Sequence, residues 1–420
     1  MTGASDRLSD LAAGATDEFD LTDPDHQDRL EQLAGTLLAE PSAEPAALRA
    51  VALDAPLEFR MAAKLVESRR ALLTAPPTRL GVVFAMWGEQ NRLTPRGPDN
   101  PHGEDSLRTK IRQLRWATAG TAVTWTLYAV DDGCPHGSGR LAQEIAEDAG
   151  AADQVQVLFL AEQVPADDGP LRSLASADDS RKGGSIILGA MQAIADGVDA
   201  VIYTDADNSV HLGQIGLLVA PFREHGARVV LGDRRHPESV LVKDAARWGV
   251  GIKSLRHMQR MAGEAIFGRG ILDTQAAFKL YESGLLAEII SDPVVFDFSF
   301  DTDWIGAFLA RGIDFTQVPF AFLDSAAESA TAKQQPMTTW ETLLKGMVAS
   351  LRHHDLLASP ASREMADVVD EEVRDYHDLD AIIDVVPPEL ADAGESSYGD
   401  PEVMSPAAMR AWLRAHRPAE

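Results

Sequence analysis

Short apolar runs alternate with segments of helical spacing through the middle of the chain. The runs are four to eight residues long, as expected of buried strands: 80–85, 123–130, 154–160 and 200–203. Segments with helical spacing, at 105–118, 138–149 and 185–195, separate them. Strand–helix–strand repeats of this kind fold with right-handed crossovers into a mostly parallel sheet. The pattern therefore predicts an α/β fold in which helices flank a mostly parallel sheet.

The N-terminal flank has a different pattern. Residues 1–75 are rich in Ala, Leu and Glu and are broken at Asp23-Pro24 and Glu40-Pro41. We predict a helical N-terminal extension that packs on the body as a stabilising arm, with the main domain following at 76–358. Four leucines define the apolar face of this extension: Leu30, Leu33, Leu37 and Leu38.

Beyond the first four strands the pattern is less regular. The runs 229–232 and 315–322 each predict one further strand. From residue 359 the chain is acidic and broken by Pro and Gly. We interpret 359–420 as a poorly packed acidic tail with one short helix at 406–414.

Polar residues follow three of the predicted strands. Glu89-Gln90, Asp131-Asp132 and the segment 205–207 each come directly after an apolar run. In open α/β sheets, ligands bind beyond the carboxyl ends of the strands. Three acidic groups at three strand ends therefore predict a binding site at that edge, although solvated loops would show the same residues.

Asp205 and Asp207 are the strongest metal candidates. Their alternate positions at a strand end place both carboxylates on one side. Like charges that close repel unless a cation lies between them, and Mg²⁺ or Mn²⁺ held by one or two carboxylates and substrate phosphates fits this place. The alternative is a helix start at Leu212, capped by Asp207 or Ser209.

Further candidates flank these strands. Asp131 and Asp132 could accept hydrogen bonds from a nucleobase or a ribose, or could form an ordinary Asp-Gly turn. Lys182, in a Gly-rich segment before a helix, could face a phosphate or simply be solvated. Arg234-Arg235 could bind phosphate or form an exposed pair.

Later polar residues lie among aromatic ones. Asp301 and Asp303 border Phe300 and Trp304, and a carboxylate in such a setting can have the raised pKa of a general base. A helix N-cap at Asp301 or Thr302 would explain the same residues. Other polar candidates in this half of the chain are Asp273, Gln275 and the pair His353-His354, in which His353 could complete a metal site or be structural.

Charge and composition narrow the function. The formal net charge of −27 disfavours nucleic acid and anionic membrane surfaces as partners. A phosphorylated substrate would need a metal or a local basic cluster. Cys134 is the single cysteine, which excludes an intramolecular disulfide and fits a reducing cytoplasm. No apolar run is long enough to span a membrane and no secretory signal is visible, so we expect a cytoplasmic protein without stable membrane insertion.

These motifs together resemble the family-two glycosyltransferases of the GT-A fold, and within them the group of dolichyl-phosphate sugar synthases. The resemblance runs from about residue 80 to residue 329. Residues 82–89 resemble the opening strand and acidic turn, 128–133 the D-D-G-S motif, 182–189 the K-G segment, 204–207 the D-x-D motif, 273–279 the D-T-Q-x-G-F-K motif, and 300–319 the F-D-x-E and E-V-P motifs.

The resemblance implies an inverting transfer of a hexose from a nucleotide-diphosphate sugar, with UDP or GDP as the nucleotide. Divalent Mg²⁺ or Mn²⁺ at Asp205 and Asp207 would hold the diphosphate. Glu89, Asp131, Asp132, Lys182 and Asp205 would bind the nucleotide. Asp273, Gln275 and Arg234 would contact the donor or acceptor sugar, and Asp303 or Asp301 would activate the acceptor hydroxyl.

The chain departs from the family at several positions. Cys134 stands for the usual Ser, Ala277 for Gly, and Asp303 for Glu. The usual C-terminal membrane helices have no counterpart, which favours a soluble small-molecule acceptor. A homodimer is compatible with the sequence.

Three other functions are weaker alternatives. A polyprenyl-phosphate glycosyltransferase would act at a membrane surface, and a sugar nucleotidyltransferase would show a Gly-rich basic loop after the first strand. A GT-A scaffold or sensor protein would not need Asp205 and Asp207. An oxidoreductase is disfavoured because no G-x-G-x-x-G follows the first strand.

Overall fold

The fold is known from a computed structural model that describes residues 2–243, 249–324 and 336–417. Its centre is a seven-stranded sheet in the order β3-β2-β1-β4-β7-β5-β8. Neighbouring strands run parallel except at β7, which is antiparallel to both β4 and β5. The strands are β1 (Thr78–Met86), β2 (Val123–Asp131), β3 (Val155–Phe159), β4 (Ala200–Tyr203), β5 (Val229–Asp233), β7 (Lys279–Glu282) and β8 (Thr316–Pro319).

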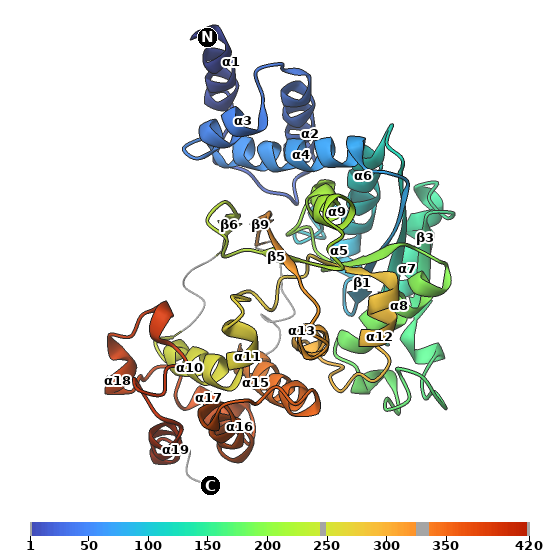
Figure 1. Cartoon of the computed structure of the whole chain (residues 1–420). Coiled ribbons are helices and arrows are strands. Elements are labelled where there is room, and N and C mark those ends of the chain that lie inside the picture. Colours follow the sequence, from blue (N-terminus) through green and yellow to red (C-terminus); the bar gives the residue numbers. More distant parts are fainter. Residues whose placement is uncertain (1, 244–248, 325–335, 418–420) are drawn as a thin grey trace.

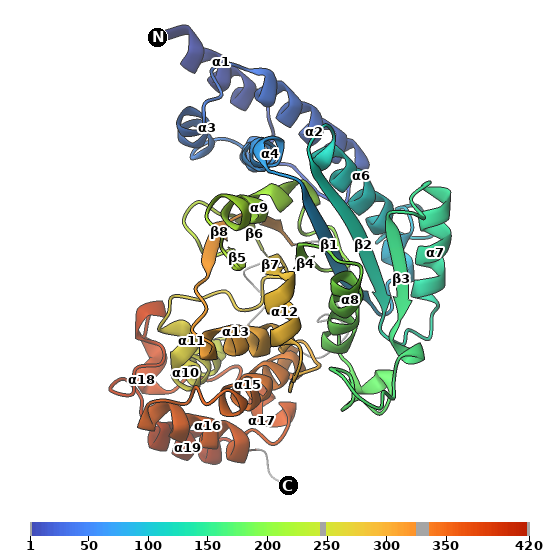
Figure 2. The same ribbon diagram turned by 45° about the vertical axis from the view of Figure 1, so that its right-hand side comes forward.

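Helices cover both faces of this sheet, as Figure 2 shows. Alternation along β1 sends Val82 and Phe84 to one face and Val83 to the other. The first face packs against α6 (Ser106–Thr118), α7 (Ser138–Asp148) and α9 (Ile215–Glu224). The second packs against α8 (Gly183–Ala195), α12 (Ser283–Ile289) and α13 (Phe300–Ala310). The prediction of a mostly parallel sheet flanked by helices is confirmed.

The first four predicted strands and the strand at 229–232 agree with β1 to β5 within a few residues. The late strand predicted at 315–322 is two strands, separated at Phe320. β8 joins the main sheet, whereas β9 (Ala321–Leu323) pairs with β6 (Val240–Val242) in a small second sheet. The sequence pattern did not indicate β7, which begins at the buried Lys279.

The N-terminal extension is helical and packs on the body, as expected (Figure 1). Its elements are α1 (Thr2–Ala13), α2 (Pro24–Ala39), α3 (Pro45–Ala52) and α4 (Leu57–Thr74). Helix α4 lies against α9 and α6. A side chain at Gly216 would clash with the Ser68 carbonyl, so glycine there permits the close approach of α9 to α4.

The C-terminal residues do not form the poorly packed tail that their composition suggested. Helices α16 (Pro360–Glu372) and α19 (Pro406–Ala415) bury Met365, Val369 and Leu413 in the same core as α10 (Ile252–Ala262). The prolines begin these helices at positions where no backbone N–H is needed, and Ser359 and Ser405 cap them. Remaining elements are α5 (Gln90–Leu93), α11 (Glu264–Phe267), α15 (Pro336–His353), α17 (Tyr376–Asp380) and α18 (Pro388–Ala391).

None of the helices within the described residues is long and apolar enough to cross a membrane. The last part of the family resemblance, 325–329, and the end of the predicted tail, 418–420, lie outside the described residues.

Candidate functional site

Charged side chains meet at the carboxyl ends of β1, β4 and β5. The parallel neighbours β1 and β4 bring Glu89 close to Asp205 and Asp207, and burial together with the negative charges of both aspartates raises the pKa of Glu89. We call the whole group the strand-end cluster and define it as the charged residues that act on one another at this edge. Its members are Glu89, Arg92, Glu104, Lys110, Lys182, Asp205, Asp207, Arg234, Asp273, Lys279 and Asp301.

Asp205 lies at the centre of this cluster and is half-buried. The ammonium of Lys182 donates to its Oδ1. Burial alone would raise the pKa of Asp205, but the neighbouring charges of Lys182, Arg234 and Lys110 lower it below its ordinary value. Asp205 is therefore ionised at neutral pH and already faces three cations.

Lys182 is held in an unusual backbone conformation. Its φ of 88° lies in the region that favours glycine. The Asp132 carboxylate holds this turn, because Oδ2 accepts the Lys182 N–H at 2.8 Å and Oδ1 accepts the hydroxyls of Ser180 and Ser185, both at 2.7 Å. Asp132 thereby aims the Lys182 side chain at the cluster.

Asp131 and Asp132 were predicted to contact the nucleotide, and both carboxylates already bind donors of the protein. The two carboxylate oxygens of Asp131 accept the N–H groups of Cys134 and Gly139, each at 2.7 Å, and these bonds close the turn into α7. Burial raises the pKa of Asp131. Direct contact of these two residues with a nucleotide remains a prediction.

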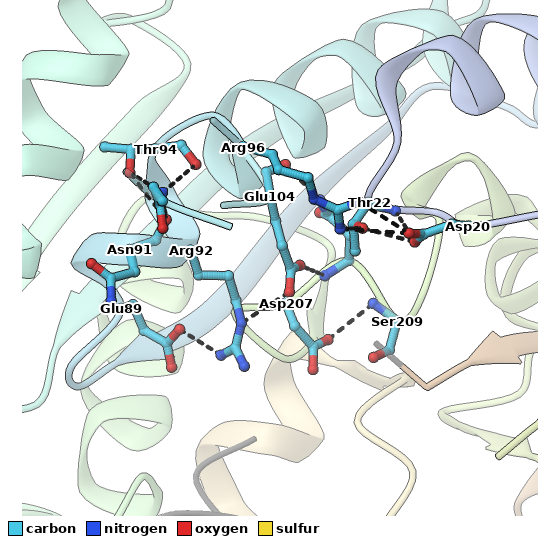
Figure 3. Close-up of polar contacts among 12 residues, drawn as sticks. Asp20, Thr22, Glu89, Asn91, Arg92, Thr94, Arg96, Glu104, Asp207 and Ser209 are labelled. Atoms are coloured by element: carbon cyan, nitrogen blue, oxygen red, sulfur yellow. Dashed lines mark hydrogen bonds and ion pairs between the residues drawn. The ribbon is translucent and has the colours of Figure 1, made fainter. Parts of the chain in front are cut away.

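Asp207 is also half-buried, and its surroundings are shown in Figure 3. Its Oδ1 accepts the N–H of Ser209 at 3.0 Å, and its backbone carbonyl accepts from Lys110. The alternative in which Asp207 or Ser209 caps a helix at Leu212 is wrong, because the helical turn that starts there is capped by His211, and Asp207 holds only the Ser209 N–H of its own loop. The helix begins later, at Ile215, after a 3₁₀ turn whose cap is His211.

Glu89 is bound to a cation that sequence reasoning missed. Arg92 donates to its Oε2 at 2.6 Å and, through Nε, to Glu104 Oε1 at 3.1 Å. Burial, more than the nearby Asp207 and Asp205, raises the pKa of Glu89. The three-residue spacing of Glu89 and Arg92 on a short helix was the one available signal for this pair.

Arg234 and Asp273 form a bidentate pair. The Nε and Nη2 atoms of Arg234 lie 2.8 and 2.7 Å from the two carboxylate oxygens, and its backbone N–H adds a third bond at 2.9 Å. These contacts lower the pKa of Asp273 to about 2, although burial works against them. Gln275 lies nearby, with its amide 3.4 Å from the Thr302 hydroxyl.

Asp301, one of the two predicted bases, is deeply buried. Its Oδ1 accepts the hydroxyl of Tyr203, and its Oδ2 lies 3.4 Å from the ammonium of Lys279. Burial raises its pKa above the ordinary value. The raised pKa agrees with the sequence argument, but the carboxylate is committed to two protein partners.

Asp303, the other predicted base, is buried as well. Its Oδ2 accepts the N–H of Val294 at 3.0 Å, and its Oδ1 lies 3.0 Å from Nε2 of His354. His353 points elsewhere, with its imidazole 3.6 Å from Asp292.

The predicted three-residue metal set is not assembled. Across the part of the chain that the structure describes, no group of three His, Cys, Asp or Glu side chains has an arrangement that could hold a metal. His353 lies 3.6 Å from Asp292 and forms no hydrogen bond or ion pair with Asp205 or Asp207 in the described part of the chain. The acidic pair Asp205 and Asp207 remains.

This pair fits a divalent cation that shares its ligands with a substrate. Mg²⁺ is commonly bound by one or two carboxylates, waters and substrate phosphates, so two protein carboxylates suffice. The buried amide oxygen of Asn208, next to Asp207, accepts no hydrogen bond from the described residues. An oxygen-rich loop with an unsatisfied acceptor is consistent with a hard cation.

Trp87 adds an aromatic surface beside the cluster. It follows β1 directly, its side chain is 53% exposed, and its ring packs edge-on against His136 at 6.3 Å. A large exposed aromatic at a strand end is a good platform for a planar ring. Sequence reasoning passed over it, although its place beside Glu89 was visible.

Similar chains among solved structures include sugar-phosphoglycerate synthases. Glucosyl-3-phosphoglycerate synthase from Mycobacterium tuberculosis, in complex with Mn²⁺, UDP and glucosyl-3-phosphoglycerate, is 14% identical with a TM-score of 0.45; the match covers 68% of this chain and 83% of that chain. Mannosyl-3-phosphoglycerate synthase from Rubrobacter xylanophilus is also 14% identical with a TM-score of 0.45, covering 70% and 80%. No protein-family model matches the chain.

Proposed function

We propose that this chain is a metal-dependent glycosyltransferase that moves a hexose from a nucleotide-diphosphate sugar to a small water-soluble acceptor. The observation that carries the proposal is the end of β4. There, two half-buried carboxylates, Asp205 and Asp207, lie among the cations Lys182, Lys110 and Arg234. Carboxylates and cations side by side suit a ligand that is itself a metal–phosphate complex. The ordered motifs of the sequence support the same donor class.

Each part of the donor has a candidate partner. Asp205 and Asp207 would hold Mg²⁺ or Mn²⁺, which when bound offsets the negative charge that develops on the leaving diphosphate. Lys182 and Arg234 lie beside Asp205, where they would face phosphate oxygens. Glu89 and the exposed ring of Trp87 would bind the nucleoside, since base stacking on an aromatic ring contributes about 1–3 kcal/mol.

On the acceptor side of the site, the candidate base is one of two buried aspartates. Both predicted bases have two protein partners, and Asp303 is the better candidate because one of its partners is the imidazole of His354, whereas Asp301 is paired with the fully buried ammonium of Lys279. Asp303 already faces His354, which would take part in orienting it. In this proposal Asp303 accepts the proton of the acceptor hydroxyl as the new bond to the sugar forms.

Nucleotide binding tests the donor half of the proposal. Thermal stability is measured with UDP, GDP and their hexose conjugates, each with and without Mn²⁺. We expect stabilisation by one nucleoside diphosphate only when the metal is present, and loss of that response in Asp207→Ala. Asp199→Ala is the matched control, because Asp199 lies at the other end of β4 and pairs with Arg223.

Two outcomes would contradict the proposal. Equal stabilisation without metal would exclude Asp205 and Asp207 as metal ligands. No response to any nucleotide would exclude a nucleotide-sugar donor and favour a scaffold. With the donor identified, release of the nucleoside diphosphate in the presence of candidate acceptors measures transfer directly, and Asp303→Asn is expected to reduce kcat.

A further inference from the structure

The loop that follows Asp207 is held by the segment 95–104, which lies outside the motif ranges of the family resemblance. Glu104 accepts the Asn208 N–H at 2.9 Å through Oε2, and its backbone carbonyl accepts the Asn208 side-chain amide at 3.0 Å. The Glu104 side chain is fully buried, with 0% exposure. Asn208, the residue next to Asp207, is thus fixed by both its backbone and its side chain.

Glu104 also ties this loop to the one after β1. Its Oε1 accepts from Arg92 at 3.1 Å, and Arg92 in turn binds Glu89 at 2.6 Å. Charge-assisted hydrogen bonds of this kind are shorter and stronger than neutral ones. One buried carboxylate therefore links the Glu89 loop to the Asp207 loop, which follow the different strands β1 and β4.

Hydrogen bonds within the segment that carries Glu104, and to the N-terminal extension, hold this loop in place. Asn100 fixes its turn, because the amide Nδ2 donates to the Asn91 carbonyl at 2.7 Å and to the Thr94 hydroxyl at 2.8 Å. Arg96 extends from the same turn to Asp20 and Thr22 of the N-terminal extension. Figure 3 shows the contacts of Arg96 with Asp20 and Thr22.

The N-terminal extension reaches the same loop by two buried routes. Gln27 of α2 accepts from Gln113 of α6 at 2.8 Å, and Gln113 in turn accepts the Leu212 N–H at 2.8 Å. In α4, the Ser68 hydroxyl donates to the Gly213 carbonyl at 2.6 Å and accepts the Gly216 N–H at 2.8 Å. The extension thereby holds the segment between Asp207 and α9.

We propose that Glu104 is a positioning residue for the Asp207 carboxylate, and that the N-terminal extension, which holds the same loop at Leu212 through Gln27 and Gln113, is a working part of the donor site. The inference rests on the proposed function, because it assumes that Asp207 binds the donor metal. Groups that orient a metal ligand from behind typically change metal affinity or activity by about 10- to 100-fold when they are removed. Glu104 binds the residue adjacent to that ligand and belongs in this class.

The test measures the Mn²⁺ concentration that gives half of the nucleoside-diphosphate response, with the diphosphate that binds the wild-type protein. In Glu104→Gln we expect this concentration to rise by about 10-fold or more, with the full response recovered at saturating Mn²⁺. Gln27→Leu removes the bond to Gln113 together with the bonds of Gln27 to Arg112 and to the Leu21 carbonyl. Because none of these bonds reaches Asn208 directly, the variant should raise this concentration by a smaller factor, about two- to tenfold. A loss of stability alone would not produce this shift.

Glu372→Gln is the matched control. Glu372 of α16 is similarly buried, at 2% exposure, and binds Arg414 of α19 and Arg417 just beyond it, among the helices that lie away from β1 and β4 in Figure 2. This variant should lower the melting temperature and leave the Mn²⁺ dependence unchanged. If it shifts the Mn²⁺ dependence as much as Glu104→Gln does, the effect is global and the inference is overturned.

The remaining outcomes separate the inference from the proposed function. A wild-type protein with no Mn²⁺-dependent nucleotide response overturns both. A normal wild-type response together with an unchanged Mn²⁺ dependence in Glu104→Gln overturns the positioning role alone. Should Glu104→Gln not fold, Asn100→Ala loosens the same loop from its half-buried turn, and an unchanged Mn²⁺ dependence there overturns the inference equally.

Discussion

Replacement of Asp301 by Asn tests whether this carboxylate is catalytic or structural. Its side chain is 5% exposed and lies 3.4 Å from the ammonium of Lys279, which is 0% exposed. Lys279 also donates to the Tyr203 hydroxyl at 2.9 Å and to the carbonyls of Thr274 and Ala276 at 2.9 and 2.6 Å. The substitution Asp301→Asn keeps the shape and an acceptor for Tyr203 but removes the negative charge.

The expected loss of stability follows from this geometry. At 3.4 Å and an effective dielectric constant of about 20, the attraction between the two charges is about 5 kcal/mol. Breaking one side of a buried pair typically costs about 3–5 kcal/mol. The three oxygens that stay bound to Lys279 place the loss for Asp301→Asn near the lower end, at about 3 kcal/mol.

The pH dependence has a defined sign. Burial already lowers the pKa of Lys279, and loss of Asp301 lowers it further. In the variant the folded state then binds fewer protons than the unfolded state between pH 7 and the ordinary lysine pKa of about 10.4, so its stability rises with pH in that range. The difference in the free energy of unfolding between variant and wild type should therefore become smaller as the pH is raised from 7 to 10.

Urea unfolding followed by circular dichroism measures both effects, and nucleoside-diphosphate release measures activity. In the double variant Asp301→Asn/Lys279→Met no buried charge is left unpaired, so it should lose less stability than the two single losses added together. The reasoning is refuted if Asp301→Asn unfolds like the wild type and yet abolishes transfer. That result would make Asp301 a catalytic group, as the sequence pattern suggested.

Two further predictions concern acid stability. The pKa of Asp273 is about 2 in the folded chain against an ordinary 3.8, so its pairing with Arg234 contributes about 2 kcal/mol above pH 4 that is lost between pH 4 and pH 2. In Asp273→Asn the urea midpoint should change less with pH between pH 4 and pH 2 than in the wild type. An unchanged pH dependence would exclude this pair as the cause of the acid sensitivity. Burial, outweighing Glu31 at 3.6 Å, lowers the pKa of His211, whose Nδ1 accepts the Gly213 N–H at 2.9 Å. Since the unfolded chain binds more protons below pH 6.5, His211→Gln should reduce the fall in melting temperature from pH 7.5 to 5; an identical fall would contradict it.

The sequence predicted the strands best where local pattern decided the structure. The runs that became β1, β2 and β4 are continuous apolar segments, which a sheet buried on both faces requires. β7 was missed because its first residue, Lys279, is charged, and its burial is stabilised by Asp301 and Tyr203 from distant segments. The C-terminal helices were missed because a proline that begins a helix looks the same in composition as one that breaks it.

The site shows the same division between local and distant information. The rule that ligands bind at strand ends led to Glu89, Asp205 and Asp207 from the sequence alone. Their partners Glu104 and Lys110 come from a loop and a helix about a hundred residues earlier in the chain than Asp207 and Asn208. No local pattern connects such residues, so the sequence predicted the carboxylates of the site and not the contacts that position them.

The local charge explains why a chain of −27 would need a metal to bind a diphosphate. As defined above for the described residues, the strand-end cluster contains six carboxylates and five cations, which leaves it close to neutral. The basic cluster that the overall charge called for is therefore present, but carboxylates of the site itself already occupy it. A nucleotide-sugar diphosphate would add about two negative charges beside Asp205, and like charges that close repel unless a cation lies between them. On the proposed function, a divalent cation supplies positive charge for the diphosphate, because the five side-chain cations are already paired with the protein's own carboxylates.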